Sequence, residues 1–174
     1  PLNYFEYAVL AALACFGREN LDYAILEVGL GGRLDAVNII DGDLSIIASL
    51  GIDHEEFLGS DRGSIGREKA GILRRDKPLI FGEPQIPESV EHYANDLEVE
   101  IYLAGRDFQE HADSKGWRIE VTEGTQRNSY CYCQRPSVAT ANAVVALQAA
   151  VLLGVSVDPN VIGDAMVVRL PGRV

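Results

Sequence analysis

Residues 23–38 constrain the fold of this chain most, because an apolar run leads there into a cluster of glycines. Residues 24–28 are apolar except for Glu27, and Gly29, Gly31 and Gly32 follow. A short apolar run bounded by glycine is typical of a strand covered on both faces, and such strands belong mostly to parallel sheets flanked by helices. We therefore expect residues 23–28 to form a buried strand that leads into a ligand-facing loop, because ligands sit beyond the carboxyl ends of such strands.

The glycine loop alone leaves two interpretations open. Glycine lets the backbone approach a ligand closely, and Arg33 and Asp35 add hydrogen-bond donors and an acceptor. The pattern G-x-G-x-x-G fails because residue 34 is leucine, so a nicotinamide-binding fold loses its main support. The alternative is a glycine-rich turn in which Glu27 makes a structural ion pair, since a buried carboxylate needs a cation or hydrogen-bond donors.

Composition excludes several classes of protein. The 174 residues are 47% hydrophobic and 24% charged, which is ordinary for one soluble globular domain. The net charge of −11 argues against a nucleic-acid partner or an anionic membrane surface. The apolar run 8–16 is too short to span a bilayer, and no charged leader precedes it. Three cysteines without a C-x-x-C motif do not make a disulfide framework, so we expect a cytoplasmic protein.

The order of predicted elements indicates an α/β fold with a mostly parallel sheet flanked by helices. Strands and helices alternate along the first part of the chain, which implies right-handed crossovers. Helices are expected at 3–19, 64–73 and 87–97, and strands at 23–28, 44–50, 78–81 and 100–103. Residues 117–122 and 129–133 alternate around a polar turn and predict a β-hairpin insertion at about 115–134. Helices at 138–153 and 159–167 follow.

Further polar residues follow the second predicted strand. His54 lies just past residues 44–50, and it could converge with Glu27 if the two strands are neighbours. The alternative is a hydrogen-bonded structural histidine. Arg67, Glu68 and Lys69 lie in the helix predicted at 64–73, where a solvated charged face is the default interpretation.

Four motifs, in this order and spacing, resemble the dihydrofolate synthase/folylpolyglutamate synthase family of the Mur ligase superfamily. They are Glu-Val-Gly-Leu-Gly-Gly-Arg-Leu-Asp-Ala at 27–36, Asp-His at 53–54, Ser-Ile-Gly-Arg-Glu-Lys-Ala-Gly-Ile at 64–72 and Leu-Pro-Gly-Arg at 170–173. The resemblance covers nearly the whole chain, and four motifs in register are far more specific than any one of them.

The resemblance implies an ATP-dependent amide ligase of folate biosynthesis and one-carbon metabolism. In the family, ATP phosphorylates a carboxylate of dihydropteroate or folate, and the amine of L-glutamate attacks the acyl phosphate. ATP would be a substrate and Mg²⁺ a cofactor that neutralises phosphate charge. We expect small-molecule partners only, and a monomer when the protein is full length.

The resemblance also assigns roles to individual residues. Glu27 and His54 would bind Mg²⁺, and Lys69 would be carried as a carbamate. The residues that would contact the pterin are Leu34, Asp35, Ala36 and Phe5. Asn142 and Arg173 would hold ATP. A carbamate forms when carbon dioxide adds to a neutral lysine amine, and it turns a cation into an anion with oxygen atoms for the metal.

The chain departs from the family pattern in one respect. A phosphate-binding Walker A loop needs Gly-Lys followed by Ser or Thr, but Lys69, Lys77 and Lys115 precede Ala, Pro and Gly. In the family this loop lies upstream and a glutamate-binding domain lies downstream. The resemblance thus implies that residues 1–174 are a partial central domain, truncated at both ends and inactive alone. Another Mur-type amino-acid ligase and a non-catalytic nucleotide-binding module remain alternatives, whereas a dehydrogenase is disfavoured.

Overall fold

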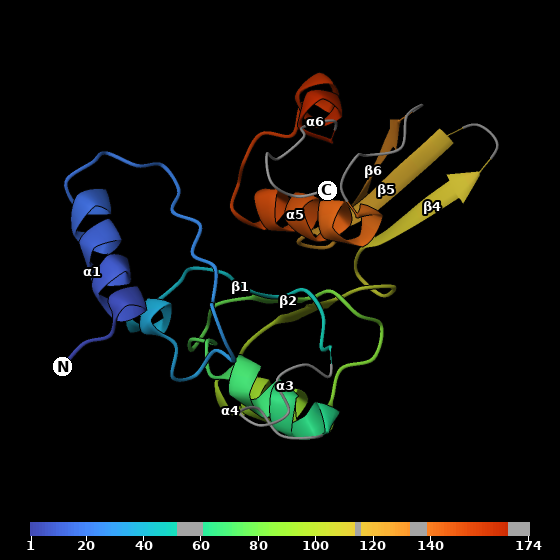
Figure 1. Ribbon diagram of the computed structural model, residues 1–174. Coiled ribbons are helices and arrows are strands. Elements are labelled where there is room, and N and C mark those ends of the chain that lie inside the picture. The colour runs from blue at the N-terminus through green and yellow to red at the C-terminus, as the bar shows by residue number, and fades with distance from the viewer. Residues whose placement is uncertain (52–60, 114–115, 133–138, 167–174) are drawn as a thin grey trace.

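The computed structural model describes residues 1–51, 61–113, 116–132 and 139–166. Figure 1 shows a parallel sheet, an antiparallel sheet and the helices around them. The helices are α1 (Tyr4–Phe16), the 3-10 helix η1 (Ala36–Ile39), α3 (Arg62–Ala70), α4 (Glu88–Asp96), α5 (Thr140–Leu152) and α6 (Pro159–Met166). The strands are β1 (Ser45–Ile47), β2 (Leu79–Phe81), β3 (Ile101–Leu103), β4 (Gln109–Asp113), β5 (Gly116–Glu123) and β6 (Gln126–Tyr132).

The parallel sheet has the order β1-β2-β3 and is covered on both faces (Figure 1). All three residues of the central strand β2 are buried. Successive side chains of a strand point to opposite faces. Leu79 and Phe81 pack in one core cluster with α3 and α4, whereas Ile80 packs in another with α5. The predicted α/β class, with a parallel sheet between helices, is confirmed.

The helices α3 and α4 pack closely beneath this sheet. The carboxylate of Asp61 caps α3 by accepting the backbone N–H groups of Gly63 and Ser64 at 2.8 and 3.0 Å. A Cβ atom added at Gly66 would lie 2.8 Å from Val90 of α4, so only glycine allows this approach. The helix predicted at 64–73 begins two residues earlier than expected, at Arg62, because Asp61 caps it, and it ends at Ala70.

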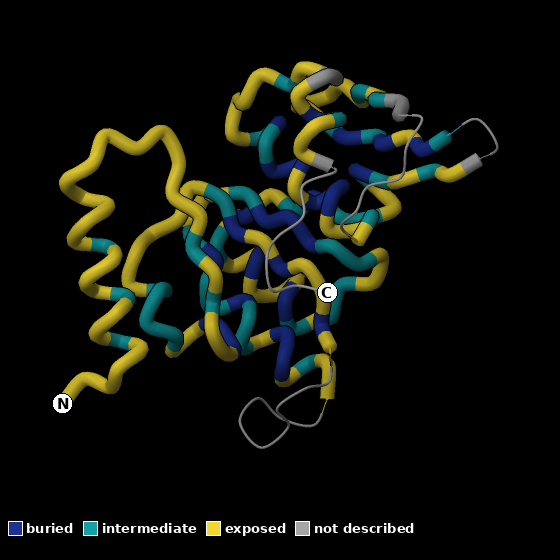
Figure 2. Tube along the Cα trace, turned by 45° about the horizontal axis from the view of Figure 1, so that its top comes forward, coloured by how far each residue is buried: buried dark blue, intermediate teal, exposed yellow. Residues whose placement is uncertain are grey.

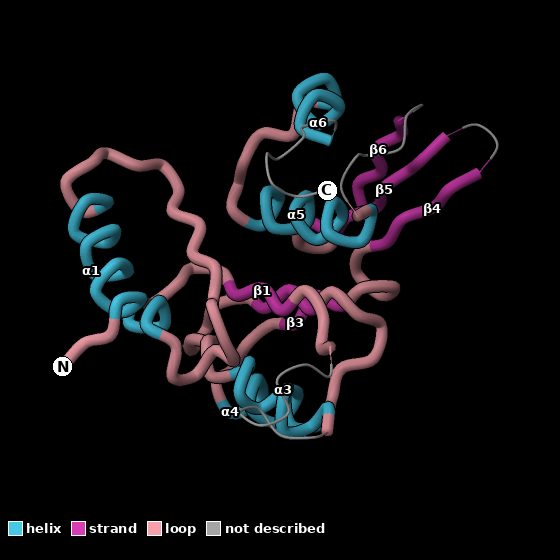
Figure 3. The backbone as a smooth tube through the Cα atoms, viewed as in Figure 1, coloured by secondary structure: helices cyan, strands magenta, loops and turns pink. Residues whose placement is uncertain are grey.

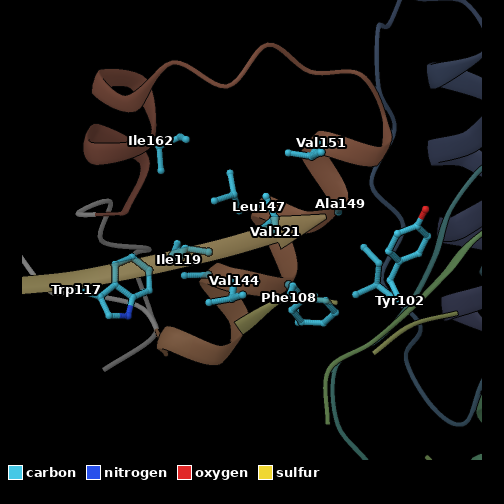
Figure 4. Packing of buried hydrophobic residues seen from close by; sticks show 13 residues of the cluster. Tyr102, Phe108, Trp117, Ile119, Val121, Val144, Leu147, Ala149, Val151 and Ile162 are labelled. Atoms are coloured by element: carbon cyan, nitrogen blue, oxygen red, sulfur yellow. The ribbon is translucent and has the colours of Figure 1, made fainter. Parts of the chain in front are cut away.

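A three-stranded antiparallel sheet, β4-β5-β6, packs on α5. Figure 4 shows Trp117, Ile119 and Val121 of β5 beside Val144 and Leu147 of α5. The predicted hairpin corresponds to β5 and β6. The first strand, β4, was not predicted, because its sequence Gln-Glu-His-Ala-Asp lacks the apolar alternation that marks a half-buried strand.

The N-terminal part of the chain differs from the sequence prediction. A capping box of Asn3 and Glu6 starts α1, which lies within the helix predicted at 3–19, but this helix buries none of its residues (Figure 2). Residues 23–28 form no strand and are mostly exposed (Figures 2 and 3). A strand needs a neighbour for its backbone hydrogen bonds, and residues 23–28 pair with no described strand. The apolar composition of residues 23–28 was therefore not enough to predict a strand.

Across the described residues, every helix is too short or too polar to cross a membrane.

Candidate functional site

The glycine loop packs directly against the helix that carries Lys69. A Cβ atom added at Gly32 would lie 3.0 Å from the carbonyl oxygen of Glu68 and 3.1 Å from the Cα atom of Lys69. One added at Gly71 would overlap the Cβ atom of Arg33 and lie 2.7 Å from its Cα atom. Glycine at these two positions lets the loop and the end of α3 meet backbone to backbone. The structure thus joins two of the sequence motifs.

Arg33 fixes the register of this contact. Its backbone N–H donates to the carbonyl oxygen of Glu68 at 2.9 Å, and its guanidinium Nε and Nη2 donate to Glu68 Oε1 at 3.1 and 2.9 Å. An exposed ion pair alone contributes little stability, but here a backbone bond supports it. The expectation of a solvated charged face is met by Arg67, which is exposed, whereas Glu68 is partnered and Lys69 is half-buried.

Asp35 holds the glycine loop in shape. Its Oδ2 atom accepts the N–H groups of Gly29 and Leu30 at 3.0 and 3.1 Å, and Oδ1 accepts that of Val37 at 3.0 Å. This last bond caps η1. The carboxylate predicted to contact a ligand therefore also organises the loop around it, with three charge-assisted hydrogen bonds.

A pocket of about 340 Å³ lies between α1 and the glycine loop. Leu2, Glu6 and Leu10 line one side. The other side is formed by residues of the loop and η1, which are Arg33, Leu34, Asp35, Ala36, Asn38 and Ile39. Phe5 closes onto the loop nearby, since a Cβ atom added at Gly29 would lie 3.1 Å from the Phe5 ring. The structure thus brings together the four residues predicted to contact a pterin.

A second polar cluster supports the segment that follows β1. Glu83 Oε1 accepts the N–H of Leu50 at 2.8 Å, Arg62 Nη1 donates to the carbonyl oxygen of Leu50 at 3.2 Å, and Arg62 also pairs with Glu83 Oε2. Burial raises the pKa of Glu83, but the hydrogen bonds from Arg62 and Leu50 and the Arg62 charge outweigh it, so the pKa is lowered. The two side chains take the place of a neighbouring strand at Leu50.

Comparison with known proteins identifies the family. No family model matches the chain. The dihydrofolate synthase/folylpolyglutamate synthase of Escherichia coli (strain K12) is 42% identical over 173 residues, which are 99% of this chain and 40% of that protein. The chain belongs to the dihydrofolate synthase/folylpolyglutamate synthase family. It spans about 40% of the length of that relative.

Solved structures of the family agree with this fold. E. coli FolC in complex with DHPP and ADP superposes with a TM-score of 0.86 at 40% identity, over 99% of this chain and 41% of that one. A bifunctional folylpolyglutamate synthase/dihydrofolate synthase with Mn, AMPPNP and L-glutamate bound gives a TM-score of 0.85 at 39% identity. The match covers 99% of this chain and 41% of that one. The Mur-ligase-type fold implied by the sequence resemblance is therefore confirmed.

The remaining residues to which the family resemblance assigns roles are spread over the fold. Glu27 lies on the exposed segment before the glycine loop, and Lys69 lies in the last turn of α3. Asn142 is exposed in the first turn of α5, which covers the other face of the parallel sheet from α3. His54 and Arg173 lie outside the described residues. The described residues contain no group of three His, Cys, Asp or Glu side chains that could hold a metal.

Sequence reasoning missed two residues that hold the site together, Asn38 and Arg74. Asn38 Nδ2 donates to the carbonyl oxygens of Arg33 and Gly71 at 3.1 and 3.0 Å, and Arg74 Nη2 donates to Asn38 Oδ1 at 3.0 Å. Most of their partners are backbone carbonyls, which leave no side-chain pattern in a sequence. The one available signal was the position of Asn38 at the end of the glycine-rich stretch.

Proposed function

We propose that this chain is part of an ATP-dependent ligase that joins L-glutamate to dihydropteroate, to folate or to both. The observation that carries the proposal is the pocket between α1 and the glycine loop, lined by Leu34, Asp35 and Ala36. It occurs in a chain 42% identical to a dihydrofolate synthase/folylpolyglutamate synthase over 99% of its length. The E. coli structure with DHPP and ADP supports a pteroate-type acceptor and a nucleotide as ligands.

The chemistry of the pocket suits a flat heteroaromatic ring with polar edges. Leu2, Leu10, Leu34, Ala36 and Ile39 supply apolar surface. Arg33, Glu6 and Asp35 supply donors and acceptors at its margin. Such a mixture of apolar walls and a few polar groups is typical of small-molecule sites. In this proposal Leu34 and Ala36 contact the pterin faces, Phe5 closes the site, and Asp35 reads a polar edge while holding the loop.

The proposed reaction has two steps. A carboxylate oxygen of the acceptor attacks the terminal phosphorus of ATP, and ADP leaves. The amine of L-glutamate then attacks the acyl carbon, phosphate leaves, and the nitrogen loses a proton to give the amide. The protein's work in phosphoryl transfer is positioning and charge neutralisation. The related structure with AMPPNP and L-glutamate bound supports the two co-substrates.

Glu27 is the described residue that we propose as a ligand of Mg²⁺, together with His54. A carboxylate oxygen is the donor that this hard cation prefers, and Glu27 is exposed at the start of the glycine loop. When bound, the metal neutralises charge on the phosphates. The Mn ion in a related structure supports a divalent metal in the family.

Lys69 is proposed to be carried as a carbamate. Carbon dioxide adds to the neutral amine and a proton is lost, so the side chain becomes an anion. Lys69 is half-buried in the last turn of α3, and its backbone lies against Gly32 of the loop that follows Glu27. The packing of Gly32 on the Lys69 backbone supports a role beside the substrate loop rather than on a solvated face.

Asn142 and Arg173 are proposed to hold ATP. An asparagine amide can pair with an adenine edge, and an arginine guanidinium can neutralise phosphate. Asn142 is exposed at the start of α5, where a ligand can reach it. Because the sequence lacks a Walker A loop, we further propose that residues 1–174 alone do not turn over ATP.

The test measures ADP formation by a chain of full family length that carries this segment, with Mg²⁺, L-glutamate and either dihydropteroate or tetrahydrofolate. Turnover that needs both glutamate and a pteroate-type acceptor supports the proposal, and the preferred acceptor defines the activity. A folded protein that shows no turnover with either acceptor contradicts it and favours a Mur-type ligase of different substrate. ATP hydrolysis by residues 1–174 alone, dependent on the acceptor, would contradict the proposed inactivity.

A further inference from the structure

Arg74 links the glycine loop to the turn that follows α3. Its side chain is 22% exposed. Nη1 donates to the carbonyl oxygens of Ile72 and Leu73 at 3.0 and 3.1 Å, on its own side of the contact. Across the contact, Nη2 donates to the carbonyl oxygen of Asn38 at 2.8 Å and to that of Ile40 at 3.3 Å. One guanidinium therefore holds two segments more than thirty residues apart in sequence.

Asn38 completes the link from the other side. Its Oδ1 atom accepts a hydrogen bond from Arg74 Nη2 at 3.0 Å. Its Nδ2 atom donates to the carbonyl oxygen of Gly71 at 3.0 Å and to that of Arg33 at 3.1 Å. Both ends of the amide are thus satisfied, and each of the two residues bonds to both segments. We call Asn38 and Arg74 the loop clamp.

The loop clamp lies next to the pocket, and Arg74 contributes nothing to its lining. Residues 33–36, 38 and 39 line the pocket on the loop side, and among the described residues no strand pairs with their backbone. Their position relative to Lys69 depends on the Arg33–Glu68 pair, on the glycine contacts and on the clamp. The clamp makes more hydrogen bonds between the glycine loop and the segment that includes α3 than the Arg33–Glu68 pair does.

We infer that Arg74 is a positioning residue for the acceptor, which acts through Asn38 by fixing Leu34, Asp35 and Ala36 against α3. The inference rests on the proposed function of the pocket. Because Arg74 itself does not touch the pocket, its loss is expected to move the loop without removing a ligand contact. Arginine is required because its planar fork has five N–H donors, whereas lysine has three donors at one point.

The kinetic test uses Arg74→Ala in a chain of full family length. The KM for the pteroate-type acceptor is expected to rise about tenfold, which corresponds to about 1.4 kcal/mol, while the KM for ATP stays unchanged. Arg74→Lys is expected to recover only part of this loss. Asn38→Ala and Arg74→Ala combined are expected to cost less than the sum of the two, because they break the same link.

The matched control is Arg75→Ala. Arg75 is the next residue, but it pairs with Glu98 and with the carbonyl oxygen of Asp96, on the side of α4. This variant is expected to keep the acceptor KM of the parent. An equal rise of the acceptor KM in both variants, or an equal rise of the acceptor and ATP KM in Arg74→Ala, would overturn the inference.

A second measurement separates the clamp from the proposed function. In residues 1–174, amide hydrogen exchange of residues 33–40 is expected to quicken about tenfold or more in Arg74→Ala and to stay unchanged in Arg75→Ala. If exchange quickens in Arg74→Ala but the unsubstituted full-length protein turns over no pteroate-type acceptor, the proposed function is refuted and the structural role of the loop clamp is supported. Unchanged exchange refutes the clamp itself, whatever the activity.

Discussion

Gln148 pairs with the backbone of Thr122 through both ends of its side-chain amide. The Oε1 atom accepts the N–H of Thr122 at 2.9 Å, and Nε2 donates to its carbonyl oxygen at 2.7 Å. Gln148 is fully buried in α5, and Thr122 belongs to β5. Buried polar groups in proteins are almost always hydrogen-bonded, and this pair satisfies four of them at once. It fixes α5 on the antiparallel sheet at one position.

We expect Gln148→Leu to destabilise the fold strongly. The leucine keeps much of the volume but leaves the N–H and carbonyl of Thr122 without these partners, at a cost of about 2–4 kcal/mol. Urea unfolding of the purified chain measures this loss. The control is Asn142→Ala, at an exposed position of the same helix, which is expected to change stability by less than about 0.5 kcal/mol. Equal effects of the two substitutions would contradict the role of Gln148.

Gly71→Ala is expected to displace the glycine loop. The new methyl group would overlap the Cβ atom of Arg33, so the loop must move away from α3. We expect acceptor binding to fall about tenfold or more, because small displacements of positioning residues are costly. Titration calorimetry with dihydropteroate measures this in a chain of full family length.

The control for the Gly71 substitution is Gly163→Ala in α6. A Cβ atom at Gly163 meets nothing within 4 Å, and alanine favours helix by up to about 1 kcal/mol. This variant is therefore expected to bind the acceptor normally and to be as stable as the parent or more so. Normal acceptor binding by Gly71→Ala would show that the loop tolerates the methyl group.

Acid is expected to weaken the support that Glu83 gives to Leu50. Burial raises the pKa of Glu83, but its hydrogen bonds to Arg62 and Leu50 and the Arg62 charge lower the pKa by more. The folded-state pKa therefore lies below the value of an ordinary glutamate, which is about 4.3. A group with a lowered pKa stabilises the fold above its unfolded-state pKa, and this contribution is lost as pH falls through the folded value.

The variant Arg62→Gln isolates this pair from the other carboxylates. It is expected to be less stable than the parent at about pH 7, and the difference should shrink as the pH falls below the ordinary glutamate pKa and then through the lowered pKa of Glu83 in the folded parent. Urea midpoints of both proteins across this range measure the difference. A difference that does not vary with pH would rule out the ion pair as its cause.

Removal of the metal is expected to abolish ligase activity. We expect EDTA to stop ADP formation in a chain of full family length and Mg²⁺ to restore it. Glu27→Gln is expected to lower the rate about 100-fold at fixed Mg²⁺, and the urea midpoint of the variant checks that the loss does not come from unfolding. Glu19→Gln, at another exposed carboxylate, serves as the control. Full activity of Glu27→Gln would exclude Glu27 as a metal ligand.

The sequence predicted those elements that local patterns of apolar residues, proline and glycine mark. The strands β2 and β3 and the helix α4 between them were expected within about one residue of their observed ends, because periodicity and Pro87 mark them locally. The prediction failed at residues 23–28, where a strand depends on a neighbour that the described sheet does not supply. It also missed β4, whose pairing with β5 rather than its composition makes it a strand.

Motif resemblance assigned roles to more residues of the candidate site than local chemistry did. The structure places the four residues assigned to the pterin near one another, since Leu34, Asp35 and Ala36 line one pocket and the Phe5 ring lies beside Gly29 of the same loop. Their roles in binding stay a prediction. Arg74 was not named, because four of its partners are backbone carbonyls and its side-chain partners, Asn38 and Asp41, lie more than thirty residues away in the sequence.

The strand β2 belongs to both hydrophobic clusters, through Leu79 and Phe81 on one side and Ile80 on the other. This strand of three residues therefore separates the two clusters. Substitutions around α3 and α4 can repack their own side without disturbing α5, provided that β2 keeps its position. Because β3 contributes to both clusters in the same way, through Tyr102 on one side and Ile101 and Leu103 on the other, we expect a sequence change on one side of the sheet to affect the other side mainly when it shifts these two strands.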